Sequence, residues 1–159
     1  MHDRPRPEHP PLDDDTRRAL IDRLNQINGD RFGGHLGYRL VDVRKGWARI
    51  EVESTQRLMN PSGVMHGGAS FGLADSAVAA ALLTIYGPGN ALLTIEMKIN
   101  YLEAVEGGTV AAEAEVVRRG RHIAVVDCDL YSDDRRLVGK ALMTFFVGPF
   151  QKNRKTRAR

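Results

Sequence analysis

A chain of 159 residues is long enough for one domain with a single hydrophobic core. Its hydrophobic content of 42% and charged content of 27% are typical of soluble globular proteins. The formal net charge of +3 comes from the C-terminal end, because residues 151–159 carry five Lys or Arg side chains and no acid, which leaves −2 for the remainder. This excludes a basic folded body that would bind nucleic acid. We expect a disordered, solvated basic tail, with binding of nucleic acid or acidic lipid by the tail as the alternative.

The single cysteine, Cys128, cannot form an internal disulfide and fits a reducing cytoplasm, where we expect the protein to be located. The N-terminus has no apolar core of the kind a secretory signal requires. Residues 64–86 are long enough to cross a membrane, but they contain His66 and Asp75. A central Asp disfavours insertion by roughly 2.5–3.5 kcal/mol. We therefore interpret this segment as a core helix and expect no membrane association.

The N-terminal part is predicted to be disordered over residues 1–12, since four prolines fall within residues 1–11. An amphipathic helix follows. Asp13, Asp14 and Asp15 suit its start, and Asn28-Gly29 suits its end. Its apolar residues share one side: Leu20, Ile21, Leu24 and Ile27.

From Gly37 the apolar residues alternate with a period of two, which predicts strands at residues 38–43 and 47–53. A helix that is apolar on all sides is expected at residues 69–85. Further strands are predicted at residues 91–101, 109–118, 122–131 and 137–147. A curved antiparallel sheet wrapped around the long helix would bury all of its sides. The prediction is one α+β domain over residues 13–150.

The inward faces of two strands alternate clearly: Val110, Ala112, Ala114, Val116 and Ala124, Val126, Cys128, Leu130. We expect an outer sheet face with further apolar residues: Leu92, Ile123, Val125 and Phe146. Such a face and the open sheet edges predict at least a dimer.

One motif combines groups suited to acyl transfer. Asn60 is followed by His66-Gly67-Gly68 at the start of the apolar helix, and then by Asp75, the only ionisable residue in residues 69–85. A lone carboxylate on an apolar helix is costly unless it has a use. Paired glycines leave backbone N–H groups accessible where the helix dipole favours a polarised carbonyl or an anion.

With this motif and order of elements, the chain resembles the hotdog-fold acyl-CoA thioesterases of the PaaI-like family. The strand Thr94–Leu102 and the turn Arg118-Arg119-Gly120-Arg121 are also similar to that family, and the resemblance covers roughly residues 34–148. It implies a dimer of hotdogs, often paired into a homotetramer, with active sites at the dimer interface. The implied substrate is an acyl-CoA thioester, and no cofactor is implied.

The resemblance also assigns roles to the residues of the motif. The Gly67 N–H polarises the thioester carbonyl, and Asp75 of the neighbouring subunit attacks it or activates water. Asn60 and Thr94 position the reacting groups, and His66 shapes the turn. Substrate or coenzyme A contacts are expected from six residues: Gly68, Tyr101, Arg118, Arg119, Gly120 and Arg121.

For most of these residues a purely structural role is the alternative to a role in the reaction. Asp75 could be satisfied by a backbone N–H or an Arg, and Gly67 could serve only a tight turn. Asn60-Pro61 could initiate a turn, and the imidazole of His66 could simply bond to backbone. The arginine turn could be a solvated hairpin tip, although guanidinium groups suit phosphates.

Other functions compete with hydrolysis. A non-catalytic acyl-CoA-binding regulator would usually need an output module, which the first 30 residues do not supply. A hydratase or dehydratase usually requires a His and a carboxylate as an acid/base pair. The sequence around His66 lacks the proline-rich setting expected for the dehydratases. No metal site is predicted, because the five His residues show no ligand spacing.

Overall fold

The computed structural model describes residues 9–149. The predicted basic tail 151–159 and residues 1–8 of the predicted disordered segment 1–12 lie outside this range. The helices and strands are α1 (Asp14–Asn28), α2 (Phe32–His35), β1 (Arg39–Arg44), β2 (Trp47–Glu53), the 3₁₀ turn η1 (Gln56–Leu58), α3 (Gly67–Tyr86), β3 (Asn90–Tyr101), β4 (Thr109–Arg119), β5 (Ile123–Tyr131) and β6 (Leu137–Pro149). Only the short α2 and η1 had no counterpart among the predicted elements.

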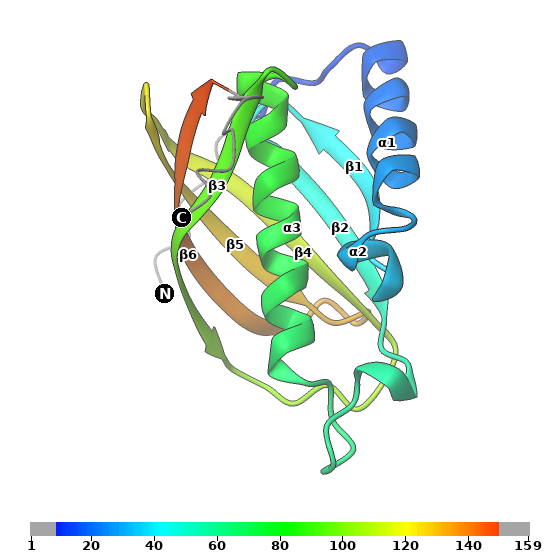
Figure 1. The fold of residues 1–159 in the computed structure, drawn as a ribbon. Helices are drawn as coiled ribbons and strands as arrows, with labels where there is room; N and C mark the ends of the chain where they lie inside the picture. The colour runs from blue at the N-terminus through cyan, green and yellow to red at the C-terminus, as the bar shows by residue number, and fades with distance from the viewer. Residues whose placement is uncertain (1–8, 150–159) are drawn as a thin grey trace, which may run out of the picture.

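The six strands form one antiparallel sheet in the order β1-β2-β4-β5-β6-β3. The sheet curves around α3, with β3 on one side of the helix and β1 on the other (Figure 1). The core lies between α3 and the concave face of the sheet. This is the α+β hotdog arrangement that the sequence predicted.

The long helix α3 leaves one stripe uncovered, so the prediction of cover on all sides was wrong in this respect. Ten of its residues are buried, among them Leu73, Ala77 and Leu82. Phe71 is exposed, and Asp75, one turn further along the same side, is half-buried. By length and composition α3 could cross a membrane, but 56% of its apolar window is buried inside the protein. The side that stays open is the side that carries the carboxylate.

The predicted inward faces of β4 and β5 are confirmed, since Val110, Ala112, Ala114 and all four residues named on β5 are buried and Val116 packs against the core. Leu92 was placed on the wrong face. It pairs with the buried Val147 and packs against the core, whereas Leu93 pairs with the exposed Phe146. Consecutive apolar residues at the start of β3 hide the alternation.

The two edges of the sheet differ in their cover. The carboxamide of Asn25 on α1 donates to the Leu40 carbonyl and accepts from the Leu40 N–H, both at 2.9 Å. Arg17 of the same helix forms an ion pair of 2.7 Å with Asp42. Thus α1 covers the β1 edge. The other edge, β3, pairs only with β6 within residues 9–149.

The segment just before α1 also contacts the sheet. Lys45 N–H donates to the Pro10 carbonyl at 3.2 Å, and His9 lies beside the β1–β2 turn with Nδ1 at 3.3 Å from the Lys45 carbonyl. Leu12 packs against the core.

Candidate active site

The start of α3 leaves one backbone donor available. His66 is the N-cap residue, and its Nδ1 accepts a hydrogen bond of 2.9 Å from the Gly68 N–H. Its carbonyl accepts from the N–H groups of Ala69 and Ser70. Among the described residues no acceptor is recorded for the Gly67 N–H. Of the first helical turn, this N–H is therefore the one that can bind an oxygen of a ligand.

The hydrogen bond to His66 also fixes the state of its imidazole. Because Nδ1 accepts the hydrogen bond from the Gly68 N–H, this nitrogen carries no proton, and the ring N–H is on Nε2. The side chain is exposed. His66 thus orders the helix start, as the structural reading predicted, and leaves an N–H on its outer side.

Gly67 lies at the wall of a cavity of about 360 Å³. The Tyr101 hydroxyl donates to the Gly67 carbonyl at 2.8 Å, and a Cβ at position 67 would lie 3.1 Å from the Tyr101 ring. Burial raises the pKa of the Tyr101 phenol. The cavity also borders Asn60, Ser70 and the segment that follows β3. Tyr101 therefore holds the first turn of α3 at the wall of the cavity. Its contact with the substrate stays a prediction.

Asn60 acts first as a turn residue. Its Oδ1 accepts from the Ser62 N–H at 2.9 Å and from the Val64 N–H at 3.4 Å. An isolated bridge between Met59 and Met65 closes the same loop. Its amide nitrogen has no recorded partner within residues 9–149, and the residue borders the cavity at Gly67. The structure thus supports the turn interpretation, and within the described residues only the amide nitrogen is left for a ligand.

Asp75 lies two turns along α3, on the open stripe. The Thr94 hydroxyl of β3 donates a hydrogen bond of 2.7 Å to its Oδ1. Asp75 borders a second cavity, of about 260 Å³, between α3, α1 and β1–β2. The pairing of β3 with β6 skips Ile95, and this bulge sets the position of Thr94 against the helix. Within residues 9–149, the recorded partner of the carboxylate is thus a hydroxyl and not a cation.

Gly67 and Asp75 do not meet within one chain. Eight residues of α-helix separate them, or about 12 Å at 1.5 Å per residue, and each borders its own cavity. One chain alone therefore does not bring the donor and the carboxylate onto one carbonyl group.

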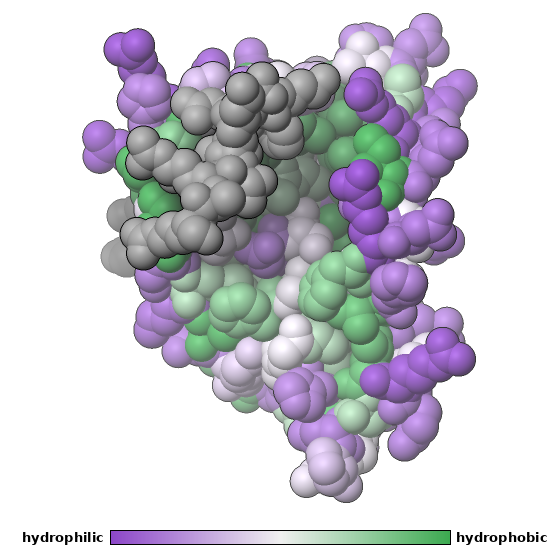
Figure 2. Space-filling view, in the orientation of Figure 1, coloured by the Kyte–Doolittle hydropathy of each residue, from purple (hydrophilic) through white to green (hydrophobic). Residues whose placement is uncertain are grey.

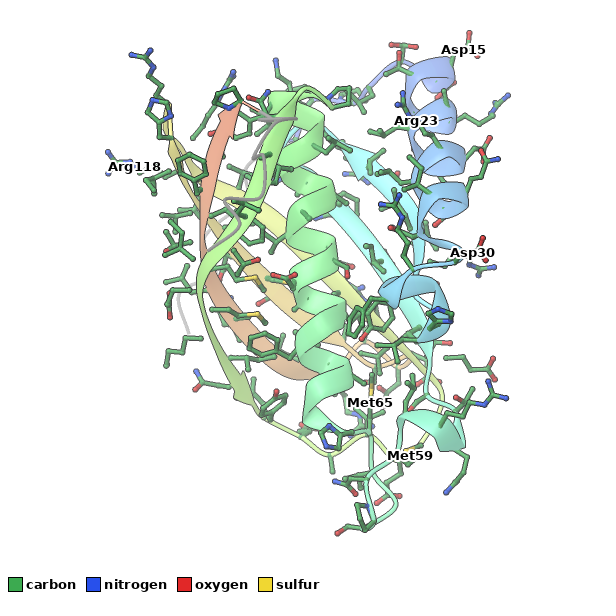
Figure 3. The ribbon with its side chains drawn as sticks, viewed as in Figure 1. Asp15, Arg23, Asp30, Met59, Met65 and Arg118 are labelled. Atoms are coloured by element: carbon green, nitrogen blue, oxygen red, sulfur yellow. The ribbon has the colours of Figure 1, made fainter. Side chains whose placement is uncertain are left out.

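The arginine turn lies at the other end of the molecule from the start of α3. Figure 3 shows Arg118 at the tip of β4, opposite Met59 and Met65. The Tyr86 hydroxyl at the end of α3 donates to the Gly120 carbonyl at 2.7 Å, and the Arg119 guanidinium lies 5.5 Å from the Tyr86 ring centroid. Arg119 and Gly120 thus have structural contacts.

Arg118 and Arg121 are exposed, with no ion pair recorded within the described residues. Gly120 is required by the turn, since a Cβ there would lie 2.3 Å from the Ile123 carbonyl oxygen. The turn therefore presents two uncommitted guanidinium groups at one end of the protein.

Two other predictions concern groups outside this site. Cys128 is fully buried, and burial, with the nearby carboxylates of Asp129 and Asp127, raises the pKa of its thiol. It is a structural residue. Within residues 9–149 no group of three or more His, Cys, Asp or Glu side chains could hold a metal ion.

Sequence reasoning missed the contribution of α1 to the second cavity, where Leu24 and Asn28 form part of the wall beside Asp75. Amphipathic spacing showed that α1 packs on the core, but it could not show against which part. On the visible part of the face with the open stripe, Figure 2 shows hydrophobic residues in the lower middle and hydrophilic residues along much of the margin.

Comparison with known proteins identifies the family. Residues 62–139 match the thioesterase superfamily. A putative esterase of Archaeoglobus fulgidus is 31% identical over 82% of this chain and 84% of its own length. A 1,4-dihydroxy-2-naphthoyl-CoA hydrolase of Listeria monocytogenes is 28% identical over 65% of this chain and 84% of its own.

Solved structures agree with this match. A thioesterase from Haemophilus influenzae superposes with a TM-score of 0.80 at 26% identity, over 84% of this chain and 94% of that one. The phenylacetic acid degradation protein PaaI of Thermus thermophilus, in a mutant form, gives a TM-score of 0.67 at 28% identity, over 72% of this chain and 96% of that one. The chain belongs to the hotdog thioesterase superfamily and is PaaI-like within it.

Proposed function

We propose that the protein hydrolyses acyl-CoA thioesters to a free acid and coenzyme A. The observation that carries this proposal is the pair of groups on α3: an N–H at Gly67 that has no recorded acceptor within residues 9–149, and a carboxylate at Asp75 oriented by Thr94. The proposal gains support from the Listeria relative that is named as an acyl-CoA hydrolase.

The chemistry requires only these groups. The Gly67 N–H hydrogen-bonds the thioester carbonyl oxygen and stabilises the negative charge that develops on it. The Asp75 carboxylate attacks the carbonyl carbon, or accepts a proton from a water molecule that attacks it. The C–S bond then breaks and coenzyme A leaves as a thiolate. If an anhydride with Asp75 forms, water cleaves it to release the acid and restore the carboxylate. Asn60 and His66 supply further donors beside the carbonyl.

The site is proposed to form between two protomers, with Gly67 from one and Asp75 from its partner. Two observations support this. Gly67 and Asp75 lie about 12 Å apart along one helix and border separate cavities. The edge strand β3 is long and carries Leu93, 58% exposed, and Ile95, 56% exposed. An exposed apolar edge strand favours pairing with another strand.

The remaining assignments follow from the substrate. Coenzyme A carries phosphates, and Arg118 and Arg121 are free to bind them. Tyr101 borders the cavity at Gly67, and Gly68 orders the helix start through its hydrogen bond to His66. We propose a cytoplasmic hydrolase without a cofactor, assembled as a dimer or as a pair of dimers.

A complementation experiment tests both the chemistry and the shared site. Asp75→Asn removes the carboxylate, and Gly67→Pro removes the N–H; each variant alone should release almost no free thiol from acyl-CoA esters. When the two variants are refolded together, half of the dimers are mixed, and each mixed dimer has one intact site. The mixture should therefore regain about one quarter of the wild-type activity.

The outcomes separate the competing functions. Activity in neither the mixture nor the wild type, on any acyl-CoA ester, would favour a non-catalytic binder or a hydratase. A mixture as inactive as its components, with an active wild type, would place both groups in one protomer. Light scattering adds a check, because a stable and active 17.6 kDa monomer would contradict the shared site.

A further inference from the structure

The cavity beside Asp75 is walled on one side by the N-terminal helix. Its apolar lining comes from five elements: Leu24 of α1, Leu40 of β1, Ile50 of β2, Leu83 of α3 and Leu92 of β3. Asp75 borders the same space. A hollow with apolar walls and one oriented carboxylate suits a ligand with an apolar body and a reactive group at one end.

The position of α1 is fixed at this cavity. The two hydrogen bonds of the Asn25 carboxamide hold the backbone of Leu40, whose side chain lines the cavity, and Leu24 is the neighbour of Asn25 in the chain. The ion pair of Arg17 with Asp42 fixes the helix two turns earlier. The Leu24 wall is therefore a rigid part of the cavity and not a loosely attached cover.

The size of the cavity limits its ligand. Its volume is about 260 Å³, against about 150 Å³ for an apolar cavity that holds benzene. Ala79 and Ala80 of α3 line it, and their small side chains leave this space open. The cavity has room for one substituted ring or a medium-length aliphatic chain.

We propose that this cavity binds the acyl group of the substrate and that Leu24 of α1 sets how long an acyl group it accepts. The inference rests on the proposed function for the identity of the ligand, and it goes beyond it by assigning a specificity role to a helix outside the matched residues 62–139. The acyl group enters past Asp75, which places the thioester carbonyl at the carboxylate.

The test compares variants at two leucines of α1. Leu24→Ala deepens the cavity, and Leu24→Phe fills it. Leu20→Ala is the matched control, because Leu20 lies one turn earlier on α1 and packs against the core without lining the cavity. The probes are S-butyl-, S-octyl- and S-dodecyl-coenzyme A, thioethers that cannot be hydrolysed. Their affinities are measured by calorimetry, after thermal melting has shown that each variant is folded.

The ratio of dodecyl to butyl affinity should rise at least about tenfold in Leu24→Ala and fall at least about tenfold in Leu24→Phe, as expected when one or more methylenes gain or lose a buried place. It should stay within about twofold in Leu20→Ala. A ratio that responds no more to Leu24 variants than to Leu20→Ala overturns the inference. Because the probes are inert, these results do not depend on catalysis.

Parallel assays of thiol release from the matching acyl-CoA esters keep the two proposals apart. Hydrolysis with an unchanged affinity ratio contradicts the role of Leu24 alone. A shifted ratio in a protein that hydrolyses no ester supports the cavity assignment and contradicts the proposed hydrolase.

Discussion

The Thr94 hydroxyl on β3 donates a hydrogen bond of 2.7 Å to the Asp75 carboxylate on α3. This contact joins the edge strand, which has no second partner strand within residues 9–149, to the one carboxylate of the central helix. Any second chain that paired with β3 would lie next to this carboxylate. The catalytic proposal and the proposed dimer therefore depend on the same part of the molecule.

Asp75→Asn is expected to abolish thioester hydrolysis and leave the fold and the oligomer unchanged. Asparagine has nearly the same shape, so no cavity opens, but it can neither attack a carbonyl nor accept a proton. Thiol release should fall to less than about a tenth of the wild-type kcat. A higher residual rate, equivalent to a change in barrier of less than about 1.4 kcal/mol, would contradict the role of Asp75.

Thr94→Val should lower kcat by a smaller factor, about 3–10-fold, because the carboxylate remains but loses the hydroxyl that orients it. Ser76→Ala is the matched control. Ser76 borders the same cavity beside Asp75, but its hydroxyl donates to the Gly72 carbonyl. If both variants lose activity equally, the Thr94 contact has no special role.

Gly67→Pro is expected to lower kcat by about 10²–10³, the usual cost of removing one oxyanion donor. Proline is well tolerated at the first position of a helix, and the extended backbone of His66, with φ −63° and ψ 133°, suits a residue before proline. Gly67→Ala is the control, because it adds the same Cβ against Tyr101 and keeps the N–H. Equal loss in both variants would assign the effect to displacement of Tyr101.

How far the sequence predicts this structure depends on the strength of the local pattern. Trp47–Glu53 alternates regularly, and the predicted strand has the observed bounds. At β3 the pattern fails, because Leu92 and Leu93 are both apolar and the bulge at Ile95 changes which residues face the helix. A bulge is fixed by pairing with β6, which no local pattern of β3 contains.

The candidate site shows the same limit. The spacing of Gly67 and Asp75 predicts that both lie on one helix, and α3 contains both. Their roles as reacting groups stay a prediction. The sequence could not show that Thr94, from a strand 19 residues further on, bonds to the carboxylate; only the resemblance suggested its role. The place of Leu24 beside Asp75 depends on how α1 docks on β1, through a side-chain contact between Asn25 and a backbone.

Neutralising the arginine turn should weaken substrate binding more than it slows the chemistry. In Arg118→Gln/Arg121→Gln, KM for acyl-CoA should rise while kcat changes little, because phosphate contacts far from the thioester act alike in the ground and transition states. The increase should shrink at high salt. Arg119 is left unchanged because its guanidinium stacks on Tyr86.

Two comparisons control this experiment. Arg18→Gln/Arg23→Gln removes the same charge from exposed positions on α1, and Figure 3 shows Arg23 on the opposite side from Arg118. An acyl-pantetheine substrate lacks the nucleotide phosphates, and its KM should not change in either variant. Equal effects on the full and truncated substrates would mean that the turn does not bind phosphate.

The last prediction concerns the hydrogen bond between Tyr38 and α3 and its effect on stability at high pH. The buried Tyr38 hydroxyl donates to the Ala69 carbonyl at 2.6 Å, and burial raises the pKa of this phenol to about 12, from 10.0. The folded state therefore favours the protonated phenol. Its contribution to stability is complete below pH 10 and is lost as the pH rises towards 12, by roughly 2–3 kcal/mol.

Tyr38→Phe removes this titration. At pH 7 the variant should be less stable by about 0.5–1.5 kcal/mol, the net value of one hydrogen bond. Urea unfolding at intervals between pH 9 and 12 should then show the wild type losing more stability than the variant, so that the two curves converge and cross. Curves that stay parallel through this range would mean that the Tyr38 phenol ionises as easily in the folded protein as in the unfolded chain.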